Sequence, residues 1–182
     1  VDQTVHTDSH GIVRADIVFS GNVFALINVD ELGISMKLEN LRSLTALAMD
    51  VLAYINEEVS FRHPLLSFNK IEFMLLYSEK DADLGYCGRN CIIFEGEQID
   101  RSPCGTGVSA RVTDLIHRGR LAVGEETLHE NLMGQHFVGK AVTSEQVSEF
   151  PAVRVEITGT AYKTGSCSFV IDENDPLTYG FP

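Results

Sequence analysis

Hydrophobic positions near the start of the chain follow the short-period pattern of β-strands. Residues 11–19 contain several β-branched side chains with partial alternation, and residues 23–29 form a more continuous apolar run. A Ser-Gly-Asn turn at 20–22 separates the two stretches. Two such stretches joined by a short polar turn are typical of a β-hairpin, which we predict over residues 11–29.

The pattern then changes to that of an amphipathic helix. Apolar residues recur at the spacing that places them on one helical face: Leu41, Leu44, Ala48, Val51, Leu52 and Ile55. Asn40 is the predicted N-cap. The helix is expected to end before His63-Pro64, because a residue that precedes proline is pushed towards extended conformations.

The rest of the chain adds one helix to several strands. Strands are predicted at residues 71–77, 91–94, 135–142, 152–158 and 161–171. A second helix is expected after Cys104 and ends at Gly119, with an apolar face formed by Val108, Val112, Leu115 and Ile116. The order ββαββαβββ predicts one α+β unit, with helices packed on a mixed or antiparallel sheet and a polar tail at 172–182.

Composition narrows the class of protein. A chain of 182 residues fits one domain, or one lobe of a larger two-lobed protein. A net charge of −12 disfavours nucleic acid and anionic membranes as partners, and no apolar stretch approaches the roughly 20 residues of a membrane span. The start at Val1 is expected to reflect a processed or truncated N-terminus. The four cysteines, too few for a disulfide scaffold, are interpreted as reduced thiols of a cytoplasmic protein: Cys87, Cys91, Cys104 and Cys167.

The segment with the strongest chemical signal is Asp100-Arg-Ser-Pro-Cys-Gly-Thr-Gly107, where a strand leads into the second helix. A helix N-terminus presents unpaired N–H groups and the positive end of its dipole. We therefore expect the pKa of the Cys104 thiol to be lowered. The N–H groups of Gly105, Thr106 and Gly107 are expected to hold a carboxylate, since glycines let an anion approach the backbone.

These parts suit removal of the α-hydrogen of an amino or imino acid. Asp100 would accept a hydrogen bond from the substrate ammonium. The charge of Asp100 also opposes thiolate formation, so either the helix dipole must outweigh it or the substrate cation must compensate. The alternative interpretation is a core cysteine at a helix start, with glycines that serve only the turn.

The octapeptide 100–107 resembles the second-cysteine signature of the proline racemase family, which also contains 4-hydroxyproline epimerases and 3-hydroxyproline dehydratases. Shorter segments along almost the whole chain resemble the family in the same order. They are residues 16–25, His63-Pro64, Arg89-Asn90, 129–131, 134–139, 158–161 and 175–181.

The resemblance implies a diaminopimelate epimerase-like fold of two pseudo-symmetric lobes, each with one cysteine facing the substrate α-carbon. It implies that Cys104 is the second catalytic cysteine and that Asp100, Gly105 and Thr106 line the substrate site. It also implies a small-molecule amino or imino acid substrate, no cofactor, no metal, and a homodimer as a common assembly.

The first lobe of that family carries a Cys-Gly-His loop, and this sequence has no such tripeptide; Cys87-Gly88-Arg89 comes nearest. Residues 1–182 are therefore expected to be the second lobe, with the first lobe and its cysteine missing from this chain. Inversion needs an acid and a base on opposite faces, so activity of the chain alone is doubtful.

Other functions were weighed against racemisation or epimerisation. Val108 stands where the racemases usually have threonine, which resembles the 3-hydroxyproline dehydratases, although these usually replace the cysteine at position 104. The Cys-x6-Arg spacing from Cys104 to Arg111 is one residue too long for a tyrosine phosphatase loop. Cys87 and Cys91 lack a second ligand pair for zinc. A non-catalytic binding or oligomerisation lobe stays open, as does the choice among proline, 4-hydroxyproline and 3-hydroxyproline.

Overall fold

The computed structural model describes residues 2–67, 70–81 and 88–180. In chain order its strands and α-helices are β1 (Gln3–Thr7), β2 (Gly11–Phe19), β3 (Val23–Asn28), α1 (Leu41–Glu58), β4 (Phe73–Ser78), β5 (Arg89–Phe94), α2 (Gly105–His117), β6 (Glu126–Glu130), β7 (His136–Val147) and β8 (Phe150–Thr158). Two 3-10 turns, η1 (Val29–Leu32) and η2 (Leu38–Asn40), precede α1.

The strands form an eight-stranded mixed sheet in which spatial order follows chain order. Neighbours are antiparallel except for the pairs β3–β4 and β5–β6, which are parallel. These are the two places where a helix intervenes, because a parallel pair needs a long crossover connection. The β5–β6 junction is narrow: Arg89 pairs with Glu130 in the register, and the Arg89 guanidinium binds the Glu130 carboxylate at 2.9 Å.

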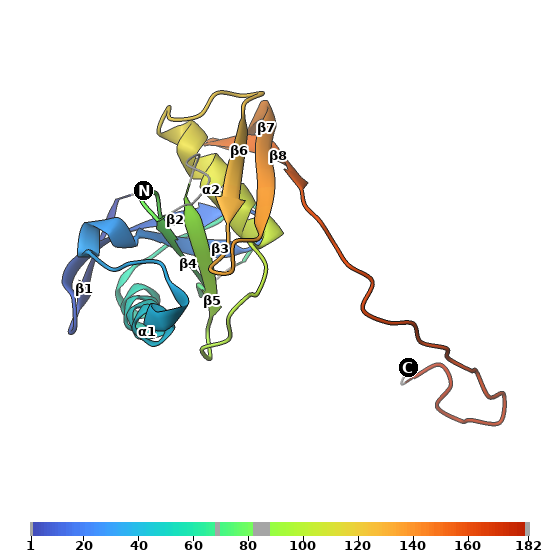
Figure 1. Cartoon of the computed structure of the whole chain (residues 1–182). Coiled ribbons are helices and arrows are strands. Elements are labelled where there is room, and N and C mark those ends of the chain that lie inside the picture. The colour runs from blue at the N-terminus through green and yellow to red at the C-terminus, as the bar shows by residue number, and fades with distance from the viewer. Residues whose placement is uncertain (1, 68–69, 82–87, 181–182) are drawn as a thin grey trace.

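The two helices cover opposite faces of the central strands (Figure 1). Along β3, Ala25 and Ile27 belong to the apolar core shared with α1, while Phe24 and Leu26 belong to the core shared with α2. Since successive side chains of a strand point to opposite faces, burial on both faces explains the continuous apolar run of β3.

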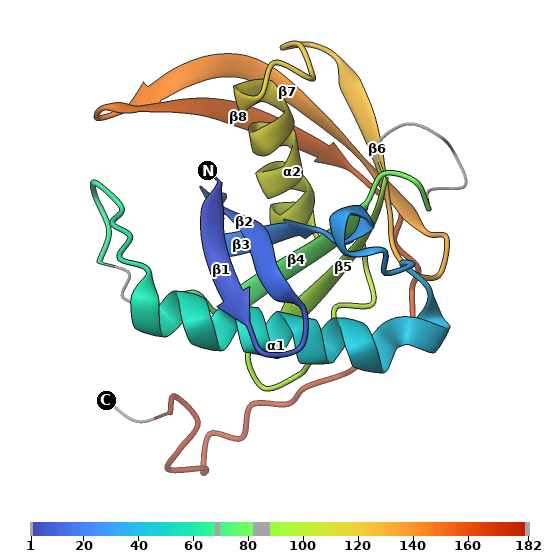
Figure 2. The same cartoon turned by 90° about the vertical axis from the view of Figure 1, so that its left-hand side faces the viewer.

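Helix α2 is enclosed from a second direction by the last two strands. Its Val108 and Val112 pack with Ala141 of β7, and Val155 and Ile157 of β8 lie against the same cluster. Figure 2 shows β7 and β8 curving over α2. The N-terminus of α2 is therefore positioned by packing on two sides, by the central strands and by the β7–β8 hairpin.

Most of the expected elements are confirmed. The hairpin at 11–29 forms from β2 and β3, α1 begins at Leu41, and α2 ends before Gly119, whose φ is +67°. Asn40 precedes α1 but makes no side-chain cap; its amide donates to the Ser35 carbonyl instead. The α+β class with a mixed sheet is confirmed. In the described part of the chain, neither helix has the length and apolar character to cross a membrane.

The strand prediction fails in two ways. The short strands β1 and β6 were missed, because five residues with alternating polar side chains give little periodic signal. The strand expected at 161–171 is wrong: this segment has no regular structure and is exposed throughout. A strand needs a neighbour for its backbone N–H and C=O groups, and none of the described strands pairs with this segment.

Candidate active site

Cys104 is the N-cap residue of α2, at the end of the loop that follows β5. Its backbone angles, φ +65° and ψ 117°, lie in a region that residues with a side chain rarely adopt. Such conformations persist only where the surroundings hold them, and they cluster at functional sites. The expected position of this sulfur at a helix start is confirmed.

A chain of hydrogen bonds holds Cys104 in this conformation. The Cys104 N–H donates to Ser102 Oγ at 3.0 Å. The Ser102 hydroxyl and N–H in turn donate to Asp100 Oδ1, at 2.9 and 2.8 Å. The carboxylate of Asp100 is therefore connected through one serine to the backbone of the candidate catalytic cysteine.

The same loop is fixed from outside by two other segments. The amide of Asn131, in the β6–β7 turn, donates to the Arg101 carbonyl at 2.6 Å. The Ser20 hydroxyl, in the β2–β3 turn, donates to the Thr106 carbonyl at 2.8 Å. Sequence reasoning missed Ser20, Ser102 and Asn131 as supporting residues. Ser20 and Asn131 bind backbone partners far along the chain, which leave no pattern in a single sequence, whereas the partners of Ser102 lie within two residues of it in the octapeptide.

The sulfur has two polar neighbours in the first turn of α2. The Gly107 N–H donates to Cys104 Sγ at 3.4 Å, and the Thr106 hydroxyl lies 3.5 Å from Sγ. Within the described residues, the N–H groups of Gly105 and Thr106 have no acceptor. The expectation of three free donors is wrong for Gly107, whose N–H the sulfur occupies.

The two glycines of this turn differ in the space around them. A Cβ on Gly107 would lie 3.1 Å from the Ile92 side chain and 3.2 Å from the Cys104 Cβ, so this position is tightly packed. At Gly105, no atom of a neighbouring segment lies within 4 Å of the corresponding point. The open side of the helix start is therefore at Gly105, next to a free N–H group.

The expected low pKa of Cys104 is wrong for this chain by itself. Burial raises the pKa of the Cys104 thiol, and the charge of Asp100 raises it further, while the hydrogen bonds from Thr106 and Gly107 lower it. The side chain packs in the apolar cluster of Ile92 and Ala110, and the residue is only 8% exposed. Loss of hydration therefore outweighs the two hydrogen bonds that the sulfur receives in the first turn of α2.

A buried ion network lies further along α2. Arg111 is fully buried, pairs with Asp114 at 2.6 Å and Glu79 at 3.0 Å, and lies 3.7 Å above the Tyr77 ring. Its guanidinium is thus committed to two carboxylates, and the one of Glu79 ties α2 to the end of β4. This arrangement differs from a phosphate-binding arginine and agrees with the rejection of a phosphatase loop.

The remaining cysteines differ in their surroundings. Cys91 is a buried core residue, as expected, and burial raises its pKa to about 12. The strand-like sequence around Cys167 predicts a structural role for this residue, but Cys167 is exposed in the tail, so that prediction is wrong. Cys87 lies outside the described residues.

His129 and His136 lie in segments that resemble the family, and for each the sequence favours a core or surface role over a place in the active cleft. His129 is fully buried, and burial, with a smaller effect of Arg111, lowers its pKa to about 3. Its Nδ1 lies 3.4 Å from the amide of Asn90. His136 is exposed. Neither contributes a free titrating group beside the sulfur.

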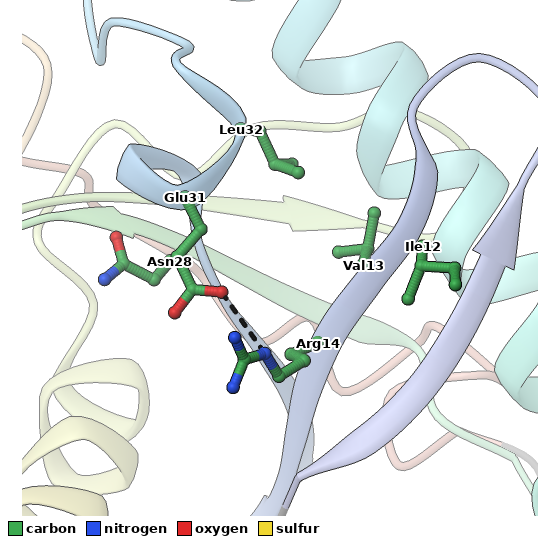
Figure 3. A pocket seen from close by; sticks show the side chains of 6 residues that line it. All are labelled: Ile12, Val13, Arg14, Asn28, Glu31 and Leu32. Carbon is green, nitrogen blue, oxygen red and sulfur yellow. Dashed lines mark ion pairs between the residues drawn. The ribbon is translucent and has the colours of Figure 1, made fainter.

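Among the hollows of the described surface, two differ in their relation to the candidate site. One of about 190 Å³ adjoins the candidate site and is lined by Asp100, Arg101 and Asn131 together with apolar residues that include Met133. The other, of about 520 Å³, lies between β2 and η1 (Figure 3). It contains none of the candidate residues, and its ion pair, Arg14 with Glu31 at 3.6 Å, is solvent-exposed. Only the first is placed to contribute to chemistry at the start of α2.

Comparison with known proteins extends over the whole chain. Proline racemase of Clostridioides difficile is 42% identical over 173 residues, which are 94% of this chain and 51% of that protein. Trans-3-hydroxy-L-proline dehydratase of Homo sapiens is 33% identical over 184 residues, or 99% of this chain and 51% of that protein. The chain spans about half the length of the curated relatives it matches.

A solved structure shows the same fold. The crystal structure of a hydroxyproline epimerase from Agrobacterium vitis, with bound trans-4-OH-L-proline, matches with a TM-score of 0.84 at 30% identity and covers 100% of this chain and 52% of that one. The diaminopimelate epimerase-like fold expected from the sequence is thereby confirmed. The family model described as Proline racemase matches residues 1–182. The chain therefore belongs to the proline racemase family.

Proposed function

We propose that this chain supplies one half of the active site of a cofactor-independent racemase or epimerase of proline or hydroxyproline, with Cys104 as one of two acid–base groups. The observation that carries the proposal is the strained N-cap position of Cys104 beside two free N–H groups, in a chain of this family. Residues 1–182 form the second lobe in this proposal, and a lobe outside this chain supplies the other cysteine.

The substrate carboxylate binds at the N–H groups of Gly105 and Thr106 in this proposal. These donors lie at the positive end of α2, where an anion is favoured. Asp100 receives the substrate ammonium. Its Oδ1 accepts both hydrogen bonds from Ser102, and Oδ2 is the oxygen that would accept from the ammonium.

In this proposal Cys104 is the protonated thiol before substrate binds, and the raised pKa of the thiol in this chain supports that state. With the thiol protonated at neutral pH, Cys104 acts first as the acid. The group on the opposite face takes the α-proton, the electron pair stays on the α-carbon, and the Cys104 S–H delivers a proton to that carbon. In the reverse direction Cys104 is the base. Deprotonation of its thiol becomes easier when the substrate cation neutralises the negative charge of Asp100.

Dehydration is the second candidate function, because two observations favour it. Val108 resembles the dehydratase branch, and the human relative is a trans-3-hydroxy-L-proline dehydratase. Dehydration starts with the same removal of the α-proton and then expels the 3-hydroxyl group. Retention of a cysteine at position 104 favours racemisation or epimerisation.

The complete protein tests the role of Cys104. Cys104→Ser is expected to abolish exchange of the substrate α-hydrogen with deuterated water, measured by NMR, while its circular dichroism spectrum stays unchanged. Cys167→Ser is the matched control and is expected to exchange normally, since Cys167 is exposed in the tail. Undiminished exchange in Cys104→Ser would remove this residue from the mechanism.

A substrate survey separates the candidate reactions. The complete protein is assayed with proline, 4-hydroxyproline and 3-hydroxyproline by polarimetry and by detection of Δ1-pyrroline-2-carboxylate. Loss of optical rotation with proline or 4-hydroxyproline supports inversion, and formation of the pyrroline from 3-hydroxyproline supports dehydration. No reaction with any of the three supports a non-catalytic lobe.

A further inference from the structure

The loop that carries Cys104 is supported on both sides of the sulfur by other segments. On the N-terminal side, the Asn131 amide in the β6–β7 turn donates to the Arg101 carbonyl at 2.6 Å. On the C-terminal side, the Ser20 hydroxyl in the β2–β3 turn donates to the Thr106 carbonyl at 2.8 Å. Within the described residues, Asn131 makes the one hydrogen bond from another segment to the stretch from Arg101 to Cys104. The backbone before the sulfur therefore depends on the β6–β7 turn.

The amide of Asn131 is fully used and its orientation is fixed. Its Oδ1 accepts from the N–H groups of Met133 and Gln135, each at 2.9 Å. Its Nδ2 donates to Gln135 Oε1 at 3.0 Å and to the Arg101 carbonyl. A side-chain amide has two donor hydrogens and two acceptor lone pairs, and the residue is only 3% exposed. One side chain thus organises its own turn and holds the loop of Cys104.

Asn131 is anchored at a narrow junction of the sheet. It follows Glu130, the last residue of β6, whose carboxylate binds Arg89 Nη2 at 2.9 Å and Nε at 3.1 Å. The Glu130 N–H donates to the Gly88 carbonyl at 3.2 Å, and Arg89 Nη1 donates to the Met36 carbonyl at 3.4 Å. In the described part of the chain, β5 and β6 share a single register pair, Arg89 with Glu130. This ion pair therefore helps to set the position of Asn131 relative to β5.

A displacement of Asn131 would reach the sulfur through three consecutive contacts. The Arg101 carbonyl would move with the amide, and the next residue, Ser102, accepts the Cys104 N–H. The φ of Cys104 is +65°, a conformation that persists only where the surroundings hold it. Asp100, on the other side of Arg101, is held to β5 by its backbone N–H. The contact with Asn131 thus lies between the two groups that must face one substrate.

We propose that Asn131 is a positioning residue, which holds the Arg101 carbonyl so that Asp100 and Cys104 keep one relative placement. The Arg89–Glu130 pair in turn holds Asn131. Asn131 does not touch the substrate. Its loss frees the loop before α2 while the core of the sheet stays folded. The effect on turnover rests on the proposed function, whereas the effect on the loop does not.

Two buried cysteines distinguish a loosened loop from an unfolded chain. Cys104 lies in the loop and is 8% exposed, and Cys91 lies in β5 and is 3% exposed. The complete protein, without substrate, is treated with iodoacetamide at mildly alkaline pH, and mass spectrometry follows both thiols. In Asn131→Ala we expect Cys104 to react about tenfold faster than in the unaltered protein, because the loop opens locally. Cys91 should react at its unaltered rate.

Two further variants separate the contact with the loop from the turn itself. Asn131→Asp keeps the oxygen that accepts from Met133 and Gln135 but removes the donor to Arg101. Its added charge opposes thiolate formation, so faster alkylation of Cys104 in this variant would report the lost contact. Gln135→Ala is the matched control: Gln135 is exposed, and the two backbone N–H groups still orient the Asn131 amide. Both thiols should react at their unaltered rates in Gln135→Ala.

Turnover should change in the opposite direction from sulfur reactivity. With the imino acid that the complete protein accepts, Asn131→Ala is expected to lower kcat about ten- to a hundredfold with a smaller change in KM. Gln135→Ala should keep both constants. A more reactive sulfur combined with slower chemistry indicates misplacement, because loss of folded enzyme would lower kcat and expose Cys91 as well.

Double variants test the path from the sheet junction. Glu130→Gln weakens the pair with Arg89, and adding it to Asn131→Ala should accelerate Cys104 alkylation no further, since both changes act on one contact. Adding Ser20→Ala to Asn131→Ala should multiply the two effects, because Ser20 holds the other side of the loop.

Three results would overturn the proposal. One is an unaltered Cys104 alkylation rate in both Asn131→Ala and Asn131→Asp. Another is a rise at Cys91 that matches the rise at Cys104, which would make Asn131 a general support of the fold. The last is a Gln135→Ala variant that reproduces the changes of Asn131→Ala. A selective rise at Cys104 in a protein that turns over none of the imino acids would refute the proposed function and support this inference.

Discussion

The side-chain oxygen of Ser102 accepts a hydrogen bond from the backbone N–H of Cys104 at 3.0 Å, while its hydroxyl hydrogen is donated to Asp100. The serine thus connects the carboxylate proposed to bind the substrate ammonium with the backbone that carries the sulfur. Because Cys104 has a positive φ, this connection holds a conformation that the chain would otherwise avoid.

Ser102→Ala is expected to loosen this arrangement. Removing the acceptor leaves the N–H of the buried Cys104 unsatisfied, which costs about 1–3 kcal/mol of unfolding free energy. In the complete enzyme we expect kcat to fall about ten- to a hundredfold with a smaller change in KM, because a displaced acid–base group affects the chemical step. Steady-state kinetics and urea unfolding measure the two effects.

Ser102→Thr is the matched control, because threonine keeps the hydroxyl group. Its kcat is expected to stay within a fewfold of the unaltered enzyme. If Ser102→Ala and Ser102→Thr lose the same activity, the hydrogen bond to Cys104 is not what positions the sulfur.

Asp100→Asn is expected to lower the pKa of the Cys104 thiol. The charge of Asp100 raises that pKa, and asparagine removes the charge while its carbonyl oxygen can still accept from Ser102. Alkylation of Cys104 by iodoacetamide, followed across pH by mass spectrometry, should therefore begin at a lower pH in this variant. In the unaltered chain the exposed Cys167 should be alkylated first.

Glu97→Gln provides the comparison for this titration. It removes the charge of an exposed carboxylate from the same connection between β5 and α2. Its alkylation profile for Cys104 should coincide with that of the unaltered chain. An equal shift in both variants would indicate a general effect of net charge.

Gly139→Ala is expected to push β7 away from α2. The added Cβ would lie 2.7 Å from Val112 Cγ2 and 2.9 Å from Val108 Cγ1, closer than packed carbon atoms approach. Overpacking of this kind costs about 1–3 kcal/mol, measured by urea unfolding. Adding Val112→Ala should recover part of that loss, whereas Gly165→Ala, in open space, should have no effect. No recovery in the double variant would contradict this packing.

His129 should make the protein lose stability in mild acid. Its pKa is lowered to about 3 in the folded chain, so below its unfolded value of about 6.5 the unfolded state binds the proton that the folded state does not. The unfolding free energy should fall by about 2 kcal/mol between pH 6.5 and pH 5 from this residue. His129→Gln should flatten that slope in urea titrations at each pH, whatever its effect on stability at neutral pH.

His136→Gln, at an exposed position, should keep the slope of the unaltered chain. Equal slopes in the unaltered chain and in His129→Gln would show that His129 titrates normally when folded.

The hydrophobic periodicity of the sequence was sufficient to predict the elements that bury apolar residues at a regular spacing. The apolar face of α1 and the two-sided run of β3 are both visible in the sequence, since burial against a sheet or between two helices imposes that spacing. The short strands β1 and β6 pair through their backbones while their side chains alternate with polar ones, so periodicity did not reveal them. Residues 161–171 show the opposite case, a strand pattern without a partner in the described chain.

The sequence by itself determined the helix start at Cys104 and the group of Asp100, Gly105 and Thr106 around it, because these residues are adjacent in the chain and glycine, proline and cysteine there constrain one local turn. Only the tertiary structure decided the state of the sulfur. Burial of Cys104 depends on strands and hairpins formed by distant parts of the chain. It raises the pKa of the Cys104 thiol, which a helix N-terminus by itself would be expected to lower. Adjacency along the chain specifies which groups meet, whereas desolvation is a property of the folded surroundings.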